Sequence, residues 1–377
     1  MTRRLLLALF VVAMTGCEAR HADTPLGLPA VPVPADNPLT PEKAELGRKL
    51  FMDRRLSHNE TISCAMCHVP EQGFTSNEMA TAVGIEGRSH RRNSPTVLNV
   101  AFMTHLFHDG RETTLENQVW GPLLTTNEMA NPSIGYVVDK IRSLPDYAGL
   151  FETAFAGRRA TMETVGQAIA SYERTLVAGN SRFDDWYYGK RANALTAEEQ
   201  AGFGVFAGKG GCRECHAVGE NSALFTDNEF HNTGIGWARS MGYRGKYKVQ
   251  LAPGVYTYVE ASEVDAMGER QPNDVGRFEV TENPADRWAY KTPTLRNIAL
   301  TAPYMHDGSI ATLEEVVDYY DRGGIDNPLK DPRVKPLQLS AGEKRALVAF
   351  LKSLTGANVE NLVQSARVAA ARSRPGA

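Results

Sequence analysis

Two short motifs carry the most specific chemistry in this chain. Each is a Cys-x-x-Cys-His pentapeptide, made of Cys64, Cys67 and His68 in the first copy and of Cys212, Cys215 and His216 in the second. This spacing is typical of covalent c-type haem, because two thiols about one helical turn apart reach two vinyl groups while the next imidazole binds iron. A single Cys-x-x-Cys could also be half of a zinc site or a redox dithiol. Two copies, each with the histidine, favour two haem c groups.

A longer internal repeat follows the two motifs. The segment HDGRETTLE at His108–Glu116 lies without a gap on HDGSIATLE at His306–Glu314, and the same register sets Tyr320 opposite Pro122. A pyrrolidine ring has no lone pair to give to iron, whereas a phenol oxygen does. We therefore expect His68 and an open sixth site at the first iron, and His216 with Tyr320 at the second.

Met305 is the alternative ligand for the second iron, with Tyr320 then facing only the core. It stands beside His306 in a predicted turn, away from the position that the repeat matches to Pro122. The two ligands differ in effect, because methionine raises the reduction potential of a haem and a phenolate disfavours the ferrous state. The register favours Tyr320.

Two polar residues stand close to Pro122 in the chain. Gln118 and Glu128 are the hydrogen-bonding and acid–base types that are needed to deprotonate bound peroxide and then to protonate the leaving oxygen. An isolated glutamate is more often an exposed surface residue. Beside an open iron site, a catalytic role is the stronger interpretation.

The N-terminus predicts export. Arg3 and Arg4 precede the apolar run Leu5–Val12 and then Cys17, the one cysteine outside the haem motifs. This order is typical of a secretory signal at residues 1–17 that ends in a lipidated cysteine, although ordinary cleavage a few residues later remains an alternative. The run is too short to span a bilayer. We expect a periplasmic protein, with a lipid anchor at Cys17.

Composition excludes little else. The 377 residues are 42% hydrophobic with a net charge of -3, which describes an ordinary globular protein and gives no sign of nucleic-acid binding. The predicted fold is all-α, with two tandem cytochrome c-like domains. The expected divisions are a signal at 1–17, a Pro-rich tether at 18–38, domains at 39–192 and 193–356, and a tail at 357–377.

Local patterns place helices around each motif. Thr40 and Thr196 are predicted N-caps of the helices that precede the motifs, the second with Glu199 in a capping box. Apolar residues at three-and-four spacing predict a buried helix at Ala168–Leu176 and another at Ala346–Leu354. The second domain also carries an insertion within about 220–290, with loops and a small hairpin expected.

From about residue 39 to 354 the chain resembles the bacterial dihaem cytochrome c peroxidase superfamily, and the pair Pro122 and Tyr320 resembles its MauG-like branch. The resemblance depends on the two haem motifs and on the segments Arg92–Thr96, His108–Gly110, Pro293–Asn297 and Thr301–Gly308.

The resemblance implies further site residues. It implies a calcium ion between the haems, bound by the Asn93 side chain and by the carbonyls of Thr301 and Pro303, and it places Gln118 and Glu128 in the distal pocket of haem 1. Oxygen ligands of this kind suit a hard cation.

Two positions depart from the family pattern. His108 stands where the family usually has a tryptophan between the haems, and Phe206–Gly211 lacks the exit tryptophan of the MauG type. In the peroxidase branch a methionine takes the place of Tyr320 and a loop histidine caps haem 1. Here the matching loop position is Ile85, with His90 nearby as an alternative cap.

The expected function is oxidation of a Trp or Tyr residue on a partner protein by long-range electron transfer. Hydrogen peroxide would supply the oxidising equivalents, held as high-valent iron on both haems. The first alternative is a peroxide-scavenging cytochrome c peroxidase that receives electrons from a small cytochrome or copper protein. The second is a non-catalytic electron-transfer or redox-sensing cytochrome, which would need both irons to be six-coordinate.

Overall fold

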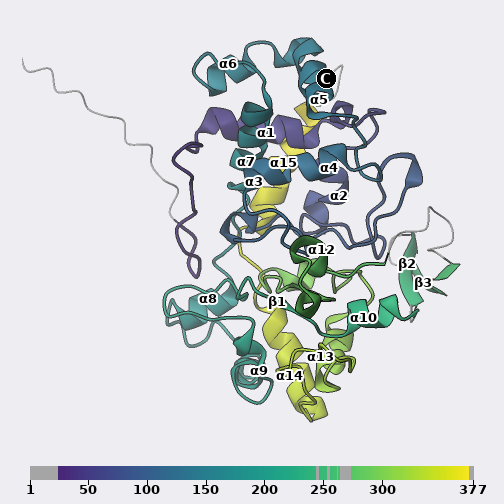
Figure 1. Ribbon diagram of the computed structural model, residues 1–377. Coiled ribbons are helices and arrows are strands. Elements are labelled where there is room, and N and C mark those ends of the chain that lie inside the picture. The colour runs from purple at the N-terminus through teal and green to yellow at the C-terminus, as the bar shows by residue number, and fades with distance from the viewer. Residues whose placement is uncertain (1–23, 243–245, 253–254, 261, 264–272, 373–377) are drawn as a thin grey trace, which may run out of the picture.

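The structure is a computed structural model that describes residues 24–242, 246–252, 255–260, 262–263 and 273–372 (Figure 1). The predicted signal at 1–17, Cys17 and the first part of the expected tether lie outside the described residues. No helix among the described residues has both the length and the apolar character that a membrane crossing requires.

Helices account for most of the regular structure. In the first half they are α1 (Pro41–Met52), α2 (Cys64–Cys67), α3 (Leu115–Gln118), α4 (Trp120–Leu124), α5 (Ile134–Ser143), α6 (Leu150–Ala154) and α7 (Met162–Glu173). In the second half they are α8 (Arg182–Tyr187), whose Phe183 is buried in the core of that half, α9 (Ala197–Ala207), α10 (Ile235–Ser240), α12 (Phe278–Thr281), α13 (Leu313–Asp321), α14 (Ala341–Lys352) and α15 (Val359–Arg372).

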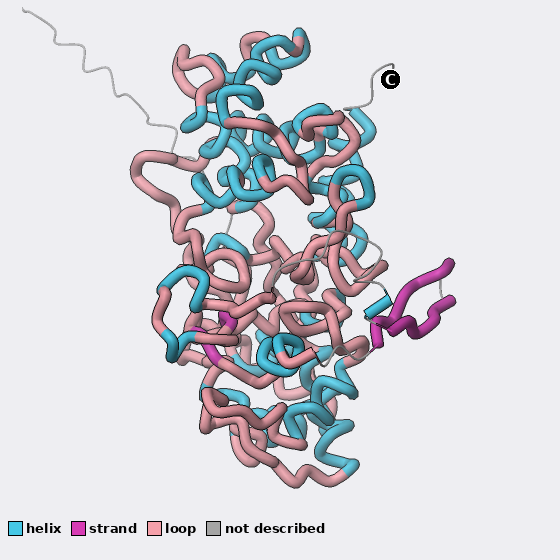
Figure 2. Tube along the Cα trace, turned by 45° about the vertical axis from the view of Figure 1, so that its right-hand side comes forward, coloured by secondary structure: helices cyan, strands magenta, loops and turns pink. Residues whose placement is uncertain are grey.

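The fold is mainly helical, with a small amount of sheet inside the predicted insertion, where a hairpin was expected. Strands β1 (Phe230–His231) and β4 (Tyr290–Lys291) pair antiparallel, and so do β2 (Lys246–Ala252) and β3 (Val255–Glu260). The β1–β4 pair holds together the two ends of the predicted insertion. The β2–β3 hairpin projects from the body of the molecule (Figures 1 and 2).

One helix pair forms the centre of each half. Helix α1 packs on α7, and α9 packs on α14 in the same way. Both contacts depend on a glycine, because a Cβ atom on Gly47 would lie 1.8 Å from the Ala168 carbonyl oxygen and one on Gly202 would lie 1.9 Å from that of Ala346. The N-caps form as expected, since the side chain of Thr40 accepts from Lys43 and Thr196 forms a capping box with Glu199.

The repeat seen in the sequence is also a repeat of backbone geometry. Asn99 and Asn297 both adopt a left-handed conformation with φ near 60°, and each begins a short 3-10 turn. A threonine side chain caps the next helix in each half, Thr114 for α3 and Thr312 for α13. Pro122 and Tyr320 therefore occupy equivalent places in the two halves.

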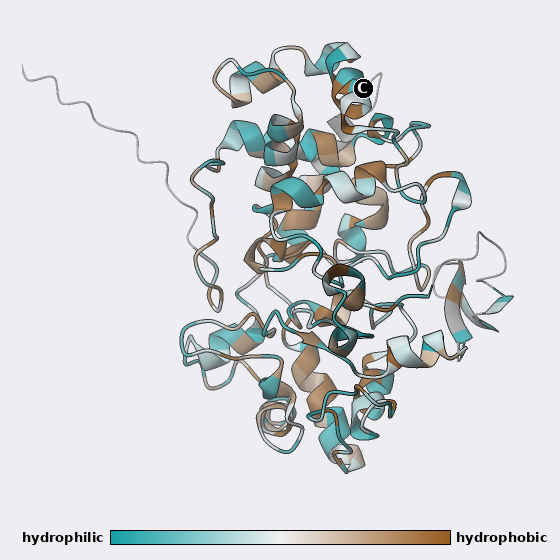
Figure 3. Ribbon diagram, in the orientation of Figure 1, coloured by the Kyte–Doolittle hydropathy of each residue, from teal (hydrophilic) through white to brown (hydrophobic). Residues whose placement is uncertain are grey.

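The C-terminal segment differs from the expected tail. Helix α15 runs back onto the first half, where Val359, Val363 and Ala366 are buried in the same core as α1 and α7 (Figures 1 and 3). Arg48 on α1 donates to the Ser365 carbonyl at 2.8 Å. The apolar residues of α15 recur at three-and-four spacing and form a stripe that needs a partner surface. This stripe explains why α15 docks on the first half.

The Pro-rich segment is not a free tether over the residues that are described. Leu28 is buried against Phe102 and Val177. The Gly27 carbonyl accepts from the Arg296 guanidinium at 2.6 Å and from the Ala223 amide at 2.9 Å. Residues 24–38 are thus part of the globular body, because their backbone groups bond to it.

Candidate active site

One cavity of about 910 Å³ connects the two sequence motifs. Its wall contains all six motif residues as well as Pro122 and Tyr320. The core aromatic rings Phe51 on α1 and Phe206 on α9 line it from equivalent positions in the two halves. A long, largely apolar space with a thiol pair and an imidazole in each half fits flat apolar macrocycles.

The four motif thiols are unpaired, and three of them have a raised pKa. All four are free, with no disulfide among them. Burial raises the pKa of Cys64 and of Cys212 to about 12 and that of Cys67 to about 11. Redox-active and metal-binding cysteines need a lowered pKa, because the thiolate is the reactive form. A raised pKa therefore argues against reactive thiolates at Cys64, Cys67 and Cys212.

Both motif histidines are held in the neutral form. Burial lowers the pKa of His68 to about 4 and also lowers that of His216. The Nδ1 of His216 lies 2.8 Å from the Phe225 carbonyl, which can only accept, so Nδ1 carries the proton and Nε2 keeps its lone pair. The His68 Nδ1 is buried without a hydrogen-bond partner among the described residues. A neutral imidazole is the form that binds iron.

Tyr320 faces the second motif from α13. It lines the cavity, and burial together with the neighbouring Tyr319, Cys212 and Cys215 raises the pKa of its phenol. In these surroundings the phenol is neutral unless a cation binds its oxygen. Met305, the alternative ligand, also lines the cavity, but from the turn before α13, where its φ is 73°. The structure thus brings both candidates to the wall of the same cavity.

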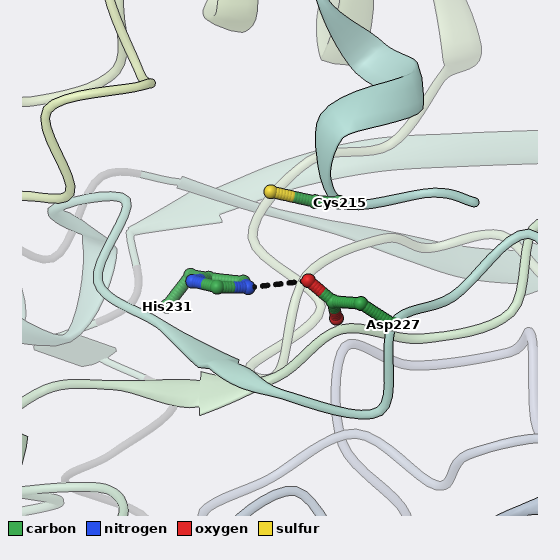
Figure 4. Close-up of side chains that lie close together, drawn as sticks. All are labelled: Cys215, Asp227 and His231. Carbon is green, nitrogen blue, oxygen red and sulfur yellow. Dashed lines mark hydrogen bonds and ion pairs between the residues drawn. The ribbon is translucent and has the colours of Figure 1, made fainter.

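Cys215, Asp227 and His231 form a second group of side chains that could bind a metal. Their ligand atoms lie within 4.8 Å of one another (Figure 4). His231 is held between two carboxylates, Asp227 and Asp331, each at 2.8 Å. Burial alone would lower the pKa of His231, but Cys215 and Asp227 raise it to about 9. The two carboxylates therefore explain the position of this imidazole without a metal.

The residues predicted near the open site come together in the first half. Gln118 on α3, Pro122 on α4 and Glu128 in the following loop all line the cavity. Pro122 is compatible with its helix because it lies in the first turn, where its missing N–H has no intrahelical partner. Burial raises the pKa of Glu128 to about 7, which is the range in which a carboxyl group can both accept and donate a proton.

His90 takes part in this pocket more directly than its sequence position indicated. Its Nδ1 lies 3.3 Å from the Glu128 carboxylate, and its Nε2 is buried without a partner among the described residues. Burial lowers its pKa to about 4, so the ring is neutral. Ile85, at the matching loop position, is a core residue. Nothing in the sequence pattern paired His90 with Glu128, since 38 positions separate them.

The residues expected between the haems lie at the junction of the two halves. The His108 Nε2 is 2.9 Å from the backbone carbonyl oxygen of Asn93. The backbone N–H of Asn93 donates to the His306 carbonyl at 2.7 Å. Burial lowers the pKa of His108 to about 3. Thr301 and Pro303 line the same cavity as Asn93.

A buried carboxyl group was missed by the sequence reasoning. Glu173, the last residue of α7, is 5% exposed and lines the cavity, and its Oε2 has no partner among the described residues. Burial raises its pKa to about 8. Its counterpart in the second half is Leu351, so a comparison of the two repeats at this position would have found it.

Comparisons with known proteins agree with this arrangement. A sequence model of the di-haem cytochrome c peroxidase family matches residues 41–192. The chain is 38% identical to the methylamine utilization protein MauG of Methylorubrum extorquens, over 86% of this chain and 81% of that protein. It is 37% identical to the cytochrome-c peroxidase IdrP1 of Denitromonas iodatirespirans, over 94% and 93%. A crystal structure of a MauG-like protein associated with microbial copper homeostasis superposes with a TM-score of 0.73 at 32% identity, over 90% and 97%.

The fold and the relatives define a haem-dependent oxidoreductase that acts with hydrogen peroxide. The chain belongs to the di-haem cytochrome c peroxidase family, which includes MauG. This identification favours an enzyme over the non-catalytic cytochrome considered from the sequence.

Proposed function

We propose that the protein uses hydrogen peroxide to oxidise a Trp or Tyr residue of a partner protein by long-range electron transfer. Two haem c groups would be attached at Cys64 and Cys67 and at Cys212 and Cys215, with His68 and His216 as proximal ligands. When bound, the haems supply iron that accepts oxidising equivalents from peroxide. The protein's part is to leave one iron accessible, close the other, and move protons at the accessible one.

The observation that carries this proposal is the difference between Pro122 and Tyr320. The two residues occupy equivalent positions in the repeat, and both line the one cavity that also contains the two motifs. Pro122 has no atom that could bind the first iron, so this position would leave the iron accessible to peroxide. Tyr320 offers a phenol oxygen at the second site, where an anionic ligand would favour the oxidised state. This division separates peroxide reduction from storage of the second oxidising equivalent.

Proton transfer in the first site falls to Glu128, with His90 behind it. A carboxyl group with a pKa of about 7 accepts a proton from peroxide and returns it to the leaving oxygen. His90 lies 3.3 Å from this carboxylate and can hold its orientation. Gln118 lines the same cavity and would hydrogen-bond to peroxide. The Glu128 position is thus the proton site of the reaction.

Further parts of the proposal follow from the sequence. The Asn93 side chain and the carbonyls of Thr301 and Pro303 would hold one calcium ion at the junction of the halves, a set of oxygen donors that suits a hard cation. The N-terminal pattern supports export to the periplasm, with a lipid anchor at Cys17. His108 would connect the two haem sites through its bond to Asn93.

The second candidate is a peroxidase that reduces hydrogen peroxide with electrons from a small cytochrome or copper protein. It is supported by the peroxidase names of relatives that cover most of the chain, including IdrP1 at 37% identity. The two functions share the first site and differ in what Tyr320 does at the second.

One experiment separates the two. Peroxide is added to the fully ferric holoprotein, and the two irons are followed by optical and Mössbauer spectroscopy. Oxidation of both irons without prior reduction is expected if Tyr320 closes the second site. A protein that reacts only after a reduced cytochrome or copper protein is supplied would be a scavenging peroxidase, and the proposed partner oxidation would be rejected.

A further inference from the structure

A chain of aromatic rings joins the second half of the cavity to the protein surface. Phe206 is fully buried and lines the cavity. The ring of Phe203 stacks 6.4 Å from that of Phe206, and the indole of Trp186 on α8 lies edge-on 5.5 Å from Phe203. Trp186 itself is half-buried. Two ring contacts therefore separate a partly exposed indole from the cavity wall.

The same indole reaches the second site by another path. Phe183 lies 6.2 Å from Trp186 and 5.2 Å from Phe225, centroid to centroid. The Phe225 carbonyl accepts the hydrogen bond from the Nδ1 of His216, at 2.8 Å. The proximal histidine of the second site is thus linked to the cluster through one residue. The aromatic cluster therefore contacts the second site in two places, through Phe206 in the cavity wall and through the Phe225 carbonyl.

The outer end of the cluster consists of side chains that can lose an electron. Tyr187 lies 5.9 Å from Trp186 and 5.6 Å from Phe203, and it is half-buried as well. The Lys190 ammonium stands 5.5 Å from the Tyr187 ring. Phenylalanine is too hard to oxidise to serve as a stopping point, whereas indole and phenol are not. The order of residue types therefore runs from inert rings at the haem site to oxidisable rings at the surface.

The aromatic series that starts at His68 in the described part of the first half is different. His68 lies 6.3 Å from Phe51, and Phe51 lies 5.3 Å from Tyr172. That series ends at Tyr172, which is 4% exposed. Among the described residues no tryptophan has a ring contact with it. Of these two series, only the one in the second half includes a half-buried indole.

We propose that Trp186 is the relay residue through which electrons from a protein partner enter the second haem site. Reduction of one hydrogen peroxide to two waters takes two electrons and two protons. For each electron, Trp186 is oxidised by one electron toward the second site and is then reduced again by one electron from the partner. The inference rests on the proposed attachment of a haem at Cys212 and Cys215, but not on which residue of the partner is oxidised.

The test uses the full-length holoprotein with the variants Trp186→Phe and Trp186→Tyr. Peroxide is added without a partner, and the samples are frozen rapidly for electron paramagnetic resonance with ring-deuterated tryptophan. The wild type is expected to give a tryptophan radical that deuteration alters, and Trp186→Phe is expected to lose it. With reduced cytochrome c as the donor, Trp186→Phe should be at least about tenfold slower in donor oxidation. Trp186→Tyr should recover most of that rate, because phenol is oxidisable and similar in size.

Trp237→Phe is the matched control. Trp237 is also half-buried, lies on α10, and has no ring contact with the cluster among the described residues. The Trp237→Phe protein should keep both the tryptophan radical and the wild-type rate of donor oxidation. The haem content of each variant, measured by mass, separates a lost relay from a lost cofactor. A Trp186→Phe protein that keeps both haems, the radical and the rate would overturn the proposal, as would equal losses in Trp237→Phe.

Discussion

The two halves of the molecule share a backbone plan and differ in the side chains that they turn toward the cavity. Helix pairs α1–α7 and α9–α14 pack through equivalent glycines, Gly47 and Gly202. The first half presents Pro122 and the carboxyl groups of Glu128 and Glu173 to the cavity, whereas the second presents Tyr320. The first half thus offers carboxyl groups to the cavity where the second offers a phenol.

This difference shows where function resides in a duplicated fold. The left-handed turns at Asn99 and Asn297 and the caps at Thr114 and Thr312 fix the start of the helix over each site. A change of side chain inside that frame alters the chemistry and leaves the backbone in place. Exchanging side chains between the halves is therefore the direct way to test what each difference contributes.

The largest expected effect comes from giving the first half the ligand of the second. Pro122→Tyr places a phenol over the first site, where it would occupy the position that peroxide needs. The reaction with peroxide should be almost abolished, because a phenol oxygen bound to the iron would leave no free position for peroxide. Stopped-flow spectroscopy measures the rate. Pro122→Ala is the control, and it should stay within about threefold of the wild type because alanine offers no ligand.

Next in size is the loss of the proton acceptor. Glu128→Gln keeps the shape of the side chain but cannot take a proton, and the peroxide rate should fall by about 10²-fold. Burial raises the pKa of Glu128 to about 7, so the carboxylate forms as the pH rises through that value. The wild-type rate should increase with pH between about 6 and 8. A Gln variant that retains this increase would assign the pH dependence to another group.

A smaller effect is expected when the second half receives a different ligand. Tyr320→Met replaces a hard oxygen donor by a thioether, so the reduction potential of the second haem should rise by roughly 0.1–0.2 V within the ~0.8 V span of axial ligands. Potentiometric titration measures it, and partner oxidation should be lost while both haems stay attached. An unchanged potential would show that Tyr320 is not a ligand, and Met305→Leu would then test the alternative.

Much of the frame could be predicted from the sequence, because the repeat aligns without a gap. The matched positions of Pro122 and Tyr320 and the caps at Thr40 and Thr196 were local patterns, and the structure contains them. Helix α15 was not predicted to dock, since its apolar stripe is short and the surface that receives it is far away in the chain.

The missing parts of the site depend on contacts between distant residues. His90 and Glu128 meet across a loop, and Trp186 meets Phe203 from a different helix, so neither pair leaves a periodic signal. The buried carboxyl of Glu173 was visible only as an ordinary charged residue near the end of a helix. Burial, which determines its chemistry, is a property of the folded chain.

The smallest effect is expected from removing that carboxyl group. Glu173→Leu gives the first half the residue that the second has at Leu351, and it replaces a buried group whose Oε2 has no partner. Removing an unsatisfied buried polar group should raise the free energy of unfolding by about 1–3 kcal/mol. Chemical denaturation of both holoproteins measures the difference.

The pH dependence of that gain has a definite sign. Burial raises the pKa of Glu173 to about 8 in the folded state, above the value of about 4.5 for a free carboxyl group. Between these values the folded protein binds a proton that the unfolded chain has lost, so the contribution of Glu173 to stability falls as the pH rises and levels off above about 8. Leu cannot ionise, and the advantage of the variant should therefore grow from pH 5 to pH 8. A constant advantage over that range would mean that the carboxyl group ionises normally in the folded state and has found a partner, such as a group on the bound haem.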